Sequence, residues 1–129
     1  MKKESLVFLF FMACINLVQA QATGPQMTFE KKTHNFGDIQ EGVIVKYSFT
    51  YTNTGTDTLI VSRVITSSGN VVPEAYTRII PPGQNGIITI AYMTEGRVGK
   101  FSKVITVIHN MNTSDSMVLF ITGNVLPKP

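Results

Sequence analysis

Cysteine is almost absent from this chain, whose 129 residues contain only Cys14. That residue lies within an N-terminal apolar stretch. If this stretch is removed on export, the mature chain has no thiol. Disulfides, thiolate nucleophiles and cysteine-based zinc sites are then excluded together.

Charge is also scarce, since Asp, Glu, Lys and Arg make up 15% of the residues. Removal of the first 20 residues leaves nine basic and seven acidic side chains. The densest positive spot is Lys31-Lys32, which we interpret as a solvated strand edge, where lysines discourage pairing with another sheet. Nucleic-acid binding requires a stripe of basic residues interleaved with stacking aromatics. The sequence has none, so we predict no nucleic-acid partner.

Histidines number two, His34 and His109. His34 precedes Asp38 by four residues, which suggests either a hydrogen bond in a turn or half of a weak metal site. A zinc site needs three or four ligands, and the pattern supplies two. His109 is expected to face a loop. No nucleophile elbow or acid pair occurs. The sequence therefore predicts no enzyme, no cofactor and no metal.

The N-terminus has the organisation of a secretory signal. A basic start, Met1-Lys2-Lys3, precedes the apolar stretch Leu6–Leu17, and Val18-Gln19-Ala20 offers small or compact residues for cleavage. The apolar stretch is shorter than the ~20 residues needed to span a bilayer. We expect cleavage after Ala20 and export to the periplasm or cell surface. The alternatives are a membrane anchor and a buried N-terminal helix.

Cys14 opens a third alternative. It follows Ala13, the small residue that a lipoprotein signal places before its cysteine. Lipidation there would tether the protein to a membrane. Phe11 is a poor residue for this signal, and the preceding apolar run is short. We expect a membrane partner only if Cys14 is lipidated.

The rest of the chain alternates with the period of a β-strand. Val43, Val45, Tyr47, Phe49 and Tyr51 lie on one face and polar residues on the other. Seven such segments recur at the spacing of a sandwich, and no window has the pattern of an amphipathic helix. We predict an all-β, seven-stranded immunoglobulin-like β-sandwich in one domain. Its divisions are a signal peptide (1–20), an N-terminal segment (21–27), the sandwich (28–126) and a tail (127–129).

Local signals predict where strands end. Asn35-Phe36-Gly37-Asp38 and Glu41-Gly42 are expected to form turns. Asn53-Thr54-Gly55 is a third, in which Gly55 supplies a positive φ and Asn53 bonds the local backbone. Pro73 is expected to end a short strand after Val71-Val72.

Two strands near the C-terminus are apolar on both faces. Phe101, Ile105, Val107, Met117, Leu119 and Ile121 are expected in the core. The opposite faces carry further apolar residues, although a wet sheet face is usually polar. We interpret these residues as a surface for self-association or for another envelope protein. The surface comprises Val104, Ile108, Val118 and Phe120, with Ile87 joining them. The alternatives are cover by the N-terminal strand or a loop, and ordinary exposed apolar atoms.

The ordered motifs resemble one family. They are F-x(6)-FG-x-I-x-EG, F-x-Y-x-NTG-x(3)-L-x-V, PPG-x-x-G-x-I-x-I-x-Y, G-x-F-x-K-x-I-x-V and L-x-I-x-G-x-V, from Phe29 to Val125. This order is similar to that of the exported bacterial domain-of-unknown-function family 1573. That family is kin to the Ig-like domains of Hydin and abnormal-spindle proteins. The resemblance implies a seven-stranded Ig-like sandwich, exported in Gram-negative bacteria, with no enzymatic activity to carry over.

One departure from the family pattern concerns function. Where family members have Cys-Gly-Cys, this chain has Ser68-Gly69-Asn70, followed by the expected Pro73-Glu74. Two thiols one residue apart bind soft metals or form a strained redox pair. Ser68-Gly69-Asn70 is instead interpreted as a hydrogen-bonded turn. We therefore favour a non-catalytic interaction or scaffolding domain over the alternative, a metal- or redox-linked periplasmic protein.

Two sites match a modification signal. Asp57-Thr58-Leu59 and Asp115-Ser116-Met117 resemble an O-glycosylation signal, Asp-Ser/Thr-apolar, in some bacteria that carry this family. Thr58 and Ser116 are the candidate acceptors. The alternative is local hydrogen bonding by Asp in a turn.

Overall fold

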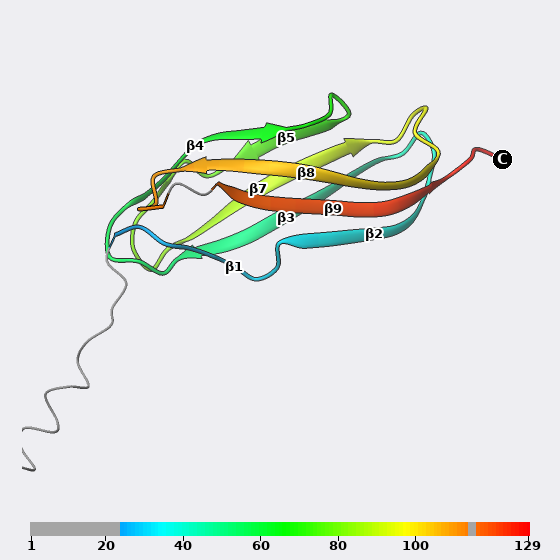
Figure 1. Cartoon of the computed structure of the whole chain (residues 1–129). Coiled ribbons are helices and arrows are strands. Elements are labelled where there is room, and N and C mark those ends of the chain that lie inside the picture. The colour runs from blue at the N-terminus through cyan, green and yellow to red at the C-terminus, as the bar shows by residue number, and fades with distance from the viewer. Residues whose placement is uncertain (1–23, 114–115) are drawn as a thin grey trace, which may run out of the picture.

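The computed structural model describes residues 24–113 and 116–129 as two β-sheets packed face to face (Figure 1). The predicted signal peptide, its cleavage site and Cys14 lie outside these described residues. In the described ranges there is no helix of the length and apolarity needed to cross a bilayer. The strands are β1 (Met27–Phe29), β2 (Thr33–Gln40), β3 (Ile44–Asn53), β4 (Leu59–Thr66), β5 (Val71–Tyr76), β6 (Ile79–Ile80), β7 (Asn85–Met93), β8 (Gly99–His109) and β9 (Met117–Leu126).

One sheet has four strands in the order β1-β3-β7-β5, and the other has five in the order β2-β9-β8-β4-β6. β2 and β9 pair in parallel, whereas the other pairs are antiparallel. The predicted all-β sandwich is confirmed. The described ranges hold nine strands where seven were predicted. In place of the single N-terminal strand that was predicted, there are two, β1 and β2, which lie in different sheets. The other additional strand is β6, which has two residues.

The core lies between the two sheets, where alternate residues of each strand point inward. Phe49, Tyr51 and Tyr92 are the largest fully buried side chains. The expected core residues Ile105, Val107, Leu119 and Ile121 are completely buried, and Phe101 and Met117 pack at its periphery.

The predicted turn at residues 35–38 is wrong, because these residues lie within β2 and form a β-bulge. The register against β9 shifts between Asn35 and Asp38, and Gly37 has a φ of 72°. The Asn35 side chain accepts a hydrogen bond of 2.8 Å from the Gly37 N–H. A turn and a bulge have the same local requirements, namely a residue with positive φ and an Asn side chain that hydrogen-bonds to the nearby backbone. Pairing with β9, which is remote in sequence, decides between them.

Pro73 also lies inside a strand rather than ending one. β5 continues to Tyr76, with a register shift against β7 between Pro73 and Ala75. Because β5 is at the edge of its sheet, the proline is not required to donate to a further strand. The predicted end of the strand at Pro73 is therefore wrong.

Asn53 and Gly55 do form a turn between β3 and β4, but Gly55 acts differently from the prediction. It is not among the glycines with positive φ. A Cβ at Gly55 would lie 2.1 Å from the backbone oxygen of Gly24. Glycine is needed here because the N-terminal segment passes directly against the turn.

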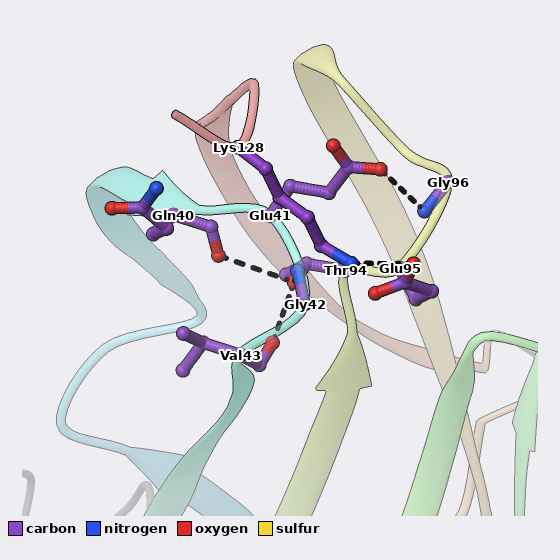
Figure 2. Close-up of polar contacts among 8 residues, drawn as sticks. All are labelled: Gln40, Glu41, Gly42, Val43, Thr94, Glu95, Gly96 and Lys128. Carbon is purple, nitrogen blue, oxygen red and sulfur yellow. Dashed lines mark hydrogen bonds and ion pairs between the residues drawn. The ribbon is translucent and has the colours of Figure 1, made fainter.

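Thr94 links two connections at the end of the sandwich that lies opposite the Asn53–Gly55 turn (Figure 2). Its buried hydroxyl accepts a bond of 2.9 Å from the Gly42 N–H and donates to the Val43 carbonyl at 2.6 Å. The turn at Glu41-Gly42 that the sequence predicts is thus held against the β7–β8 connection. Lys128 of the tail makes an exposed ion pair of 2.8 Å with Glu95 beside it.

Candidate functional site

The outer face of the five-stranded sheet carries the second set of apolar residues of β8 and β9, the set predicted to lie opposite the core-facing residues. Val104 is directly opposite Phe120, and Thr106 is opposite Val118. Their neighbours Ile105, Leu119 and Ile121 are fully buried, so this second set points away from the core. Val104, Ile108, Val118 and Phe120 are each half-buried. The structure therefore brings these four predicted residues together on one surface.

Ile65 of β4 also belongs to this surface, although it was not predicted from the sequence. It pairs with Thr106, remains 39% exposed, and lies diagonally from Ile108, which pairs with Arg63. The signal was present, because Leu59–Ile65 also has apolar residues at both odd and even positions. We call Val104, Ile108, Val118, Phe120 and Ile65 the apolar patch.

Ile87 does not belong to the apolar patch, which corrects the prediction that it joins the others. It lies on β7 in the four-stranded sheet, opposite Thr50 of β3. Ile88 is buried in the core, and Gly86 lies against the buried Tyr51 ring. Because side chains alternate along a strand, Ile87 between them faces solvent on the other side of the sandwich. Its strand pattern resembles that of β8, but the pattern does not specify the sheet.

Cover by the N-terminal strand is also contradicted. β1 pairs with β3 in the four-stranded sheet, opposite the apolar patch. In Figure 1, β8 and β9 lie at the front, and the described part of the chain does not pass across them. A few exposed apolar atoms are ordinary on a protein surface. This patch differs in that its residues lie on three neighbouring strands.

Polar side chains form a row beside the patch, across β2, β9 and β8. Asp38 pairs with Asn124, and Asn124 pairs with Lys100. The Asn124 amide donates to Asp38 at 3.3 Å, and Asp38 and Lys100 are exposed. An open hollow of about 320 Å³ lies here, and Gly37, Gly123 and Phe101 are among its lining residues. We call Asp38, Asn124 and Lys100 the polar row.

His34 is held in an aromatic cluster between the two sheets. Its ring stacks on Tyr47 at a centroid distance of 3.7 Å and meets the edge of Phe36 at 4.6 Å. Lys31 Nζ lies 3.1 Å from His34 Nδ1. Burial, and secondarily the positive charge of Lys31, lowers the pKa of His34 below its usual 6.5. A neutral ring whose Nδ1 accepts from the Lys31 ammonium fits this position.

We expect the NMR titration of His34 to report a pKa below 6.5, and Lys31→Met to raise it partway back. In the unfolded state the His34 ring gains a proton near pH 6.5, whereas in the folded state it does so only at lower pH. The contribution of His34 to stability is therefore complete above that pH and is lost as pH falls through the folded pKa. Lys32→Met is the matched control and should leave the titration unchanged. A pKa of 6.5 or above in the native protein would contradict this account.

The second half of a metal site at His34 is not found. In the part of the chain that the structure describes, no three His, Cys, Asp or Glu side chains are grouped to hold a metal ion. Asp38 contacts Asn124 instead. His109 ends β8, and its Nδ1 accepts a hydrogen bond of 3.1 Å from the Met111 N–H, so it is engaged with the loop that follows.

Ser68-Gly69-Asn70 forms the hydrogen-bonded turn that the sequence predicts. The Val71 N–H donates to the Ser68 carbonyl at 3.1 Å, and the Ser68 hydroxyl accepts from the Asn70 N–H at 3.4 Å. Met93 of β7 bonds the Asn70 carbonyl at 2.9 Å, and Arg97 donates to the Asn70 side chain. These contacts give the turn a structural role.

Both candidate glycosylation acceptors are exposed. Thr58 lies in the β3–β4 connection and Ser116 immediately before β9. Asn110 donates to the Thr58 carbonyl at 3.2 Å, which places this loop beside the start of the β8–β9 connection. Asp115, the first residue of the second signal, lies outside the described residues. Modification at Thr58 and Ser116 stays a prediction.

A family model confirms the resemblance. Residues 27–125 match the family described as "Protein of unknown function (DUF1573)". The chain belongs to this family. No curated protein matches it in sequence. The family description names no activity, so membership establishes an uncharacterised Ig-like domain and no more specific role.

Solved structures share its fold. The ASH/PapD-like domain 7 of human CEP192 has a TM-score of 0.68 at 9% identity, over 87% of this chain and 93% of that one. A Porphyromonas gingivalis W83 protein of unknown function has 0.66 at 18% identity, over 84% and 50%. The Vibrio cholerae VesB protease has 0.63 at 16% identity, over 78% and 31%. The chain thus spans about a third to a half of the length of the last two, and these identities support the fold alone.

Proposed function

We propose that this family member is a non-catalytic Ig-like interaction or scaffolding domain, exported to the periplasm or surface of a bacterial cell envelope. The observation that carries the proposal is the apolar patch on the outer face of the five-stranded sheet. The signal-like N-terminus supports export. An envelope module without thiols would act through contact with another protein.

The composition of the patch suits protein contact. Phe120 opposite Val104 and the neighbouring Val118 provide one aromatic and two branched side chains, each half-exposed in the free protein. Docking would remove their remaining surface from water, which contributes about 25 cal/mol per Å² of apolar area. Aromatic residues at the centre of an interface commonly carry much of its binding energy. We therefore expect Phe120 to contribute most of the binding energy of the patch.

Crosslinking in the native host tests this role. With a photoreactive residue at Thr106, beside Val118, we expect the exported protein to capture a defined partner. Val118→Ser with Phe120→Lys should abolish capture while leaving the fold intact, because both side chains point away from the core.

Ile87→Ser with Thr50→Lys is the matched control, since it makes comparable changes to a cross-strand pair on the opposite sheet. It should leave capture unchanged. Equal capture by the native protein and by the Val118/Phe120 variant, with circular dichroism showing both folded, would refute the docking role of the patch.

A further inference from the structure

We propose that the occupant of this outer face is a second copy of the chain, docked about a two-fold axis that runs along β9. The inference rests on the proposed function and names its partner. Its basis is the arrangement of charge and apolar side chains on either side of β9, which is the middle strand of the β2-β9-β8 segment of the sheet (Figure 1).

The polar row supplies complementary charge. Asp38 on β2 and Lys100 on β8 lie at the same level on opposite sides of Asn124 on β9. Each is one strand spacing, about 4.8 Å, from β9. A two-fold axis along β9 exchanges the two sides, so Asp38 would face Lys100 of the second copy and Lys100 would face its Asp38. One symmetry operation thus creates two intermolecular ion pairs.

The apolar residues of β9 match under the same operation, whereas Val104 on β8 would face Thr33 of the second copy. Phe120 and Val118 of β9 lie on the axis, so they would meet their own counterparts in the second copy. At the other end of β9, Leu126 is 42% exposed and also lies on the axis, so it would meet its own counterpart. Such self-matching is what an isologous dimer requires.

The alternative two-fold axis, across the strands through the polar row, is disfavoured by the same residues. It would place Asp38 against Asp38 and Lys100 against Lys100, which are like-charge contacts. It would also place Leu126 against Thr122 and leave Phe120 and Val118 beyond the end of the second copy's β9, with the polar row at the centre. The charge pattern therefore favours the axis parallel to β9 over this one.

The expected contact is small. Three strands span about 14 Å and the ten residues of β9 about 33 Å, so the facing area is roughly 500 Å² per copy. A total near 1,000 Å² is at the low end for specific association, where complexes are weak and transient. We therefore expect a dimer that forms with rising concentration.

A charge-reversal series tests the geometry in protein purified after export, by sedimentation velocity over a concentration series. Asp38→Lys leaves Lys against Lys at both contacts, and Lys100→Asp leaves Asp against Asp. Each variant alone should self-associate at least about tenfold more weakly than the native protein. Mixed in equal amounts they should associate with each other, because every contact then pairs Lys with Asp. Lys46→Asp, on the other sheet, is the control and should behave as native.

Each outcome decides the proposal. Weak single variants and a restored mixture support it. A native protein that stays monomeric at every concentration overturns it, and so do single variants that associate as the native protein does, or a mixture that stays monomeric. A monomeric native protein that still captures a different envelope protein through Val118 and Phe120 would leave the proposed function in place while removing the second copy.

Discussion

Replacing Asn53 by alanine is expected to destabilise the domain by about 3–5 kcal/mol, a large part of the ~5–15 kcal/mol typical of a domain. Asn53 is completely buried. Its amide donates to the carbonyls of Asp57 and Ile80, each at 2.8 Å. Its side-chain oxygen accepts from the Gly55 N–H at 3.0 Å and from the Gln26 N–H at 3.3 Å. Alanine would leave all four backbone groups without this partner, and the Ile80 carbonyl is buried.

Thermal unfolding followed by circular dichroism measures the effect. Asn110→Ala is the matched control, because Asn110 makes two comparable backbone bonds, to Ile60 and Thr58, in exposed positions. Water replaces those bonds, so we expect a loss of about 1 kcal/mol or less. Equal losses for the two alanine variants would show that burial of Asn53 does not matter.

Replacing Gly86 by alanine is the second large effect we expect, with a loss of about 2–3 kcal/mol. Gly86 is opposite Tyr51 across β3 and β7, and the Tyr51 ring lies over it. A Cβ at Gly86 would come within 2.4 Å of the ring atom Cζ. Tyr51 is buried and its hydroxyl donates to the Thr77 carbonyl at 3.2 Å, so the ring has little freedom to move.

Gly69→Ala is the control for Gly86, because a Cβ there has no atom within 4 Å and its φ is not positive. We expect that change to be neutral or stabilising by a few tenths of a kcal/mol. Combining Gly86→Ala with Tyr51→Leu should cost less than the sum of the two single losses, since the shorter side chain removes the clash. Strict additivity in urea unfolding would contradict the contact.

Chemistry that is local in sequence was predicted well. Val45 to Tyr51 alternates as the structure shows, because successive side chains of a strand point to opposite faces wherever the strand lies. The turn at Glu41-Gly42 and the turn at Ser68-Gly69-Asn70 follow from the backbone preferences of their own residues. The bulge at Gly37 did not follow, since its positive φ suits a turn equally well.

The candidate site was predictable only in part. Val104 and Phe120 were placed on a second apolar face from their own strands, and the pairing of β8 with β9 joins them. Ile87 has the same kind of pattern but belongs to the other sheet. The polar row had no sequence signal, because Asp38 and Lys100 are brought together only by the pairing of β2 and β8 on either side of β9.

The sequence by itself determined an all-β sandwich of this family, because strand period, turn residues and motif order are local properties of the chain. Tertiary structure alone decided which strands share a sheet, and therefore which exposed residues share a surface. It also decided that Asn53 is buried and that Gly55 lies directly against the backbone of Gly24, beyond their roles in the turn. The physical reason is that strand pairing joins residues remote in sequence, and register assigns each side chain to a face.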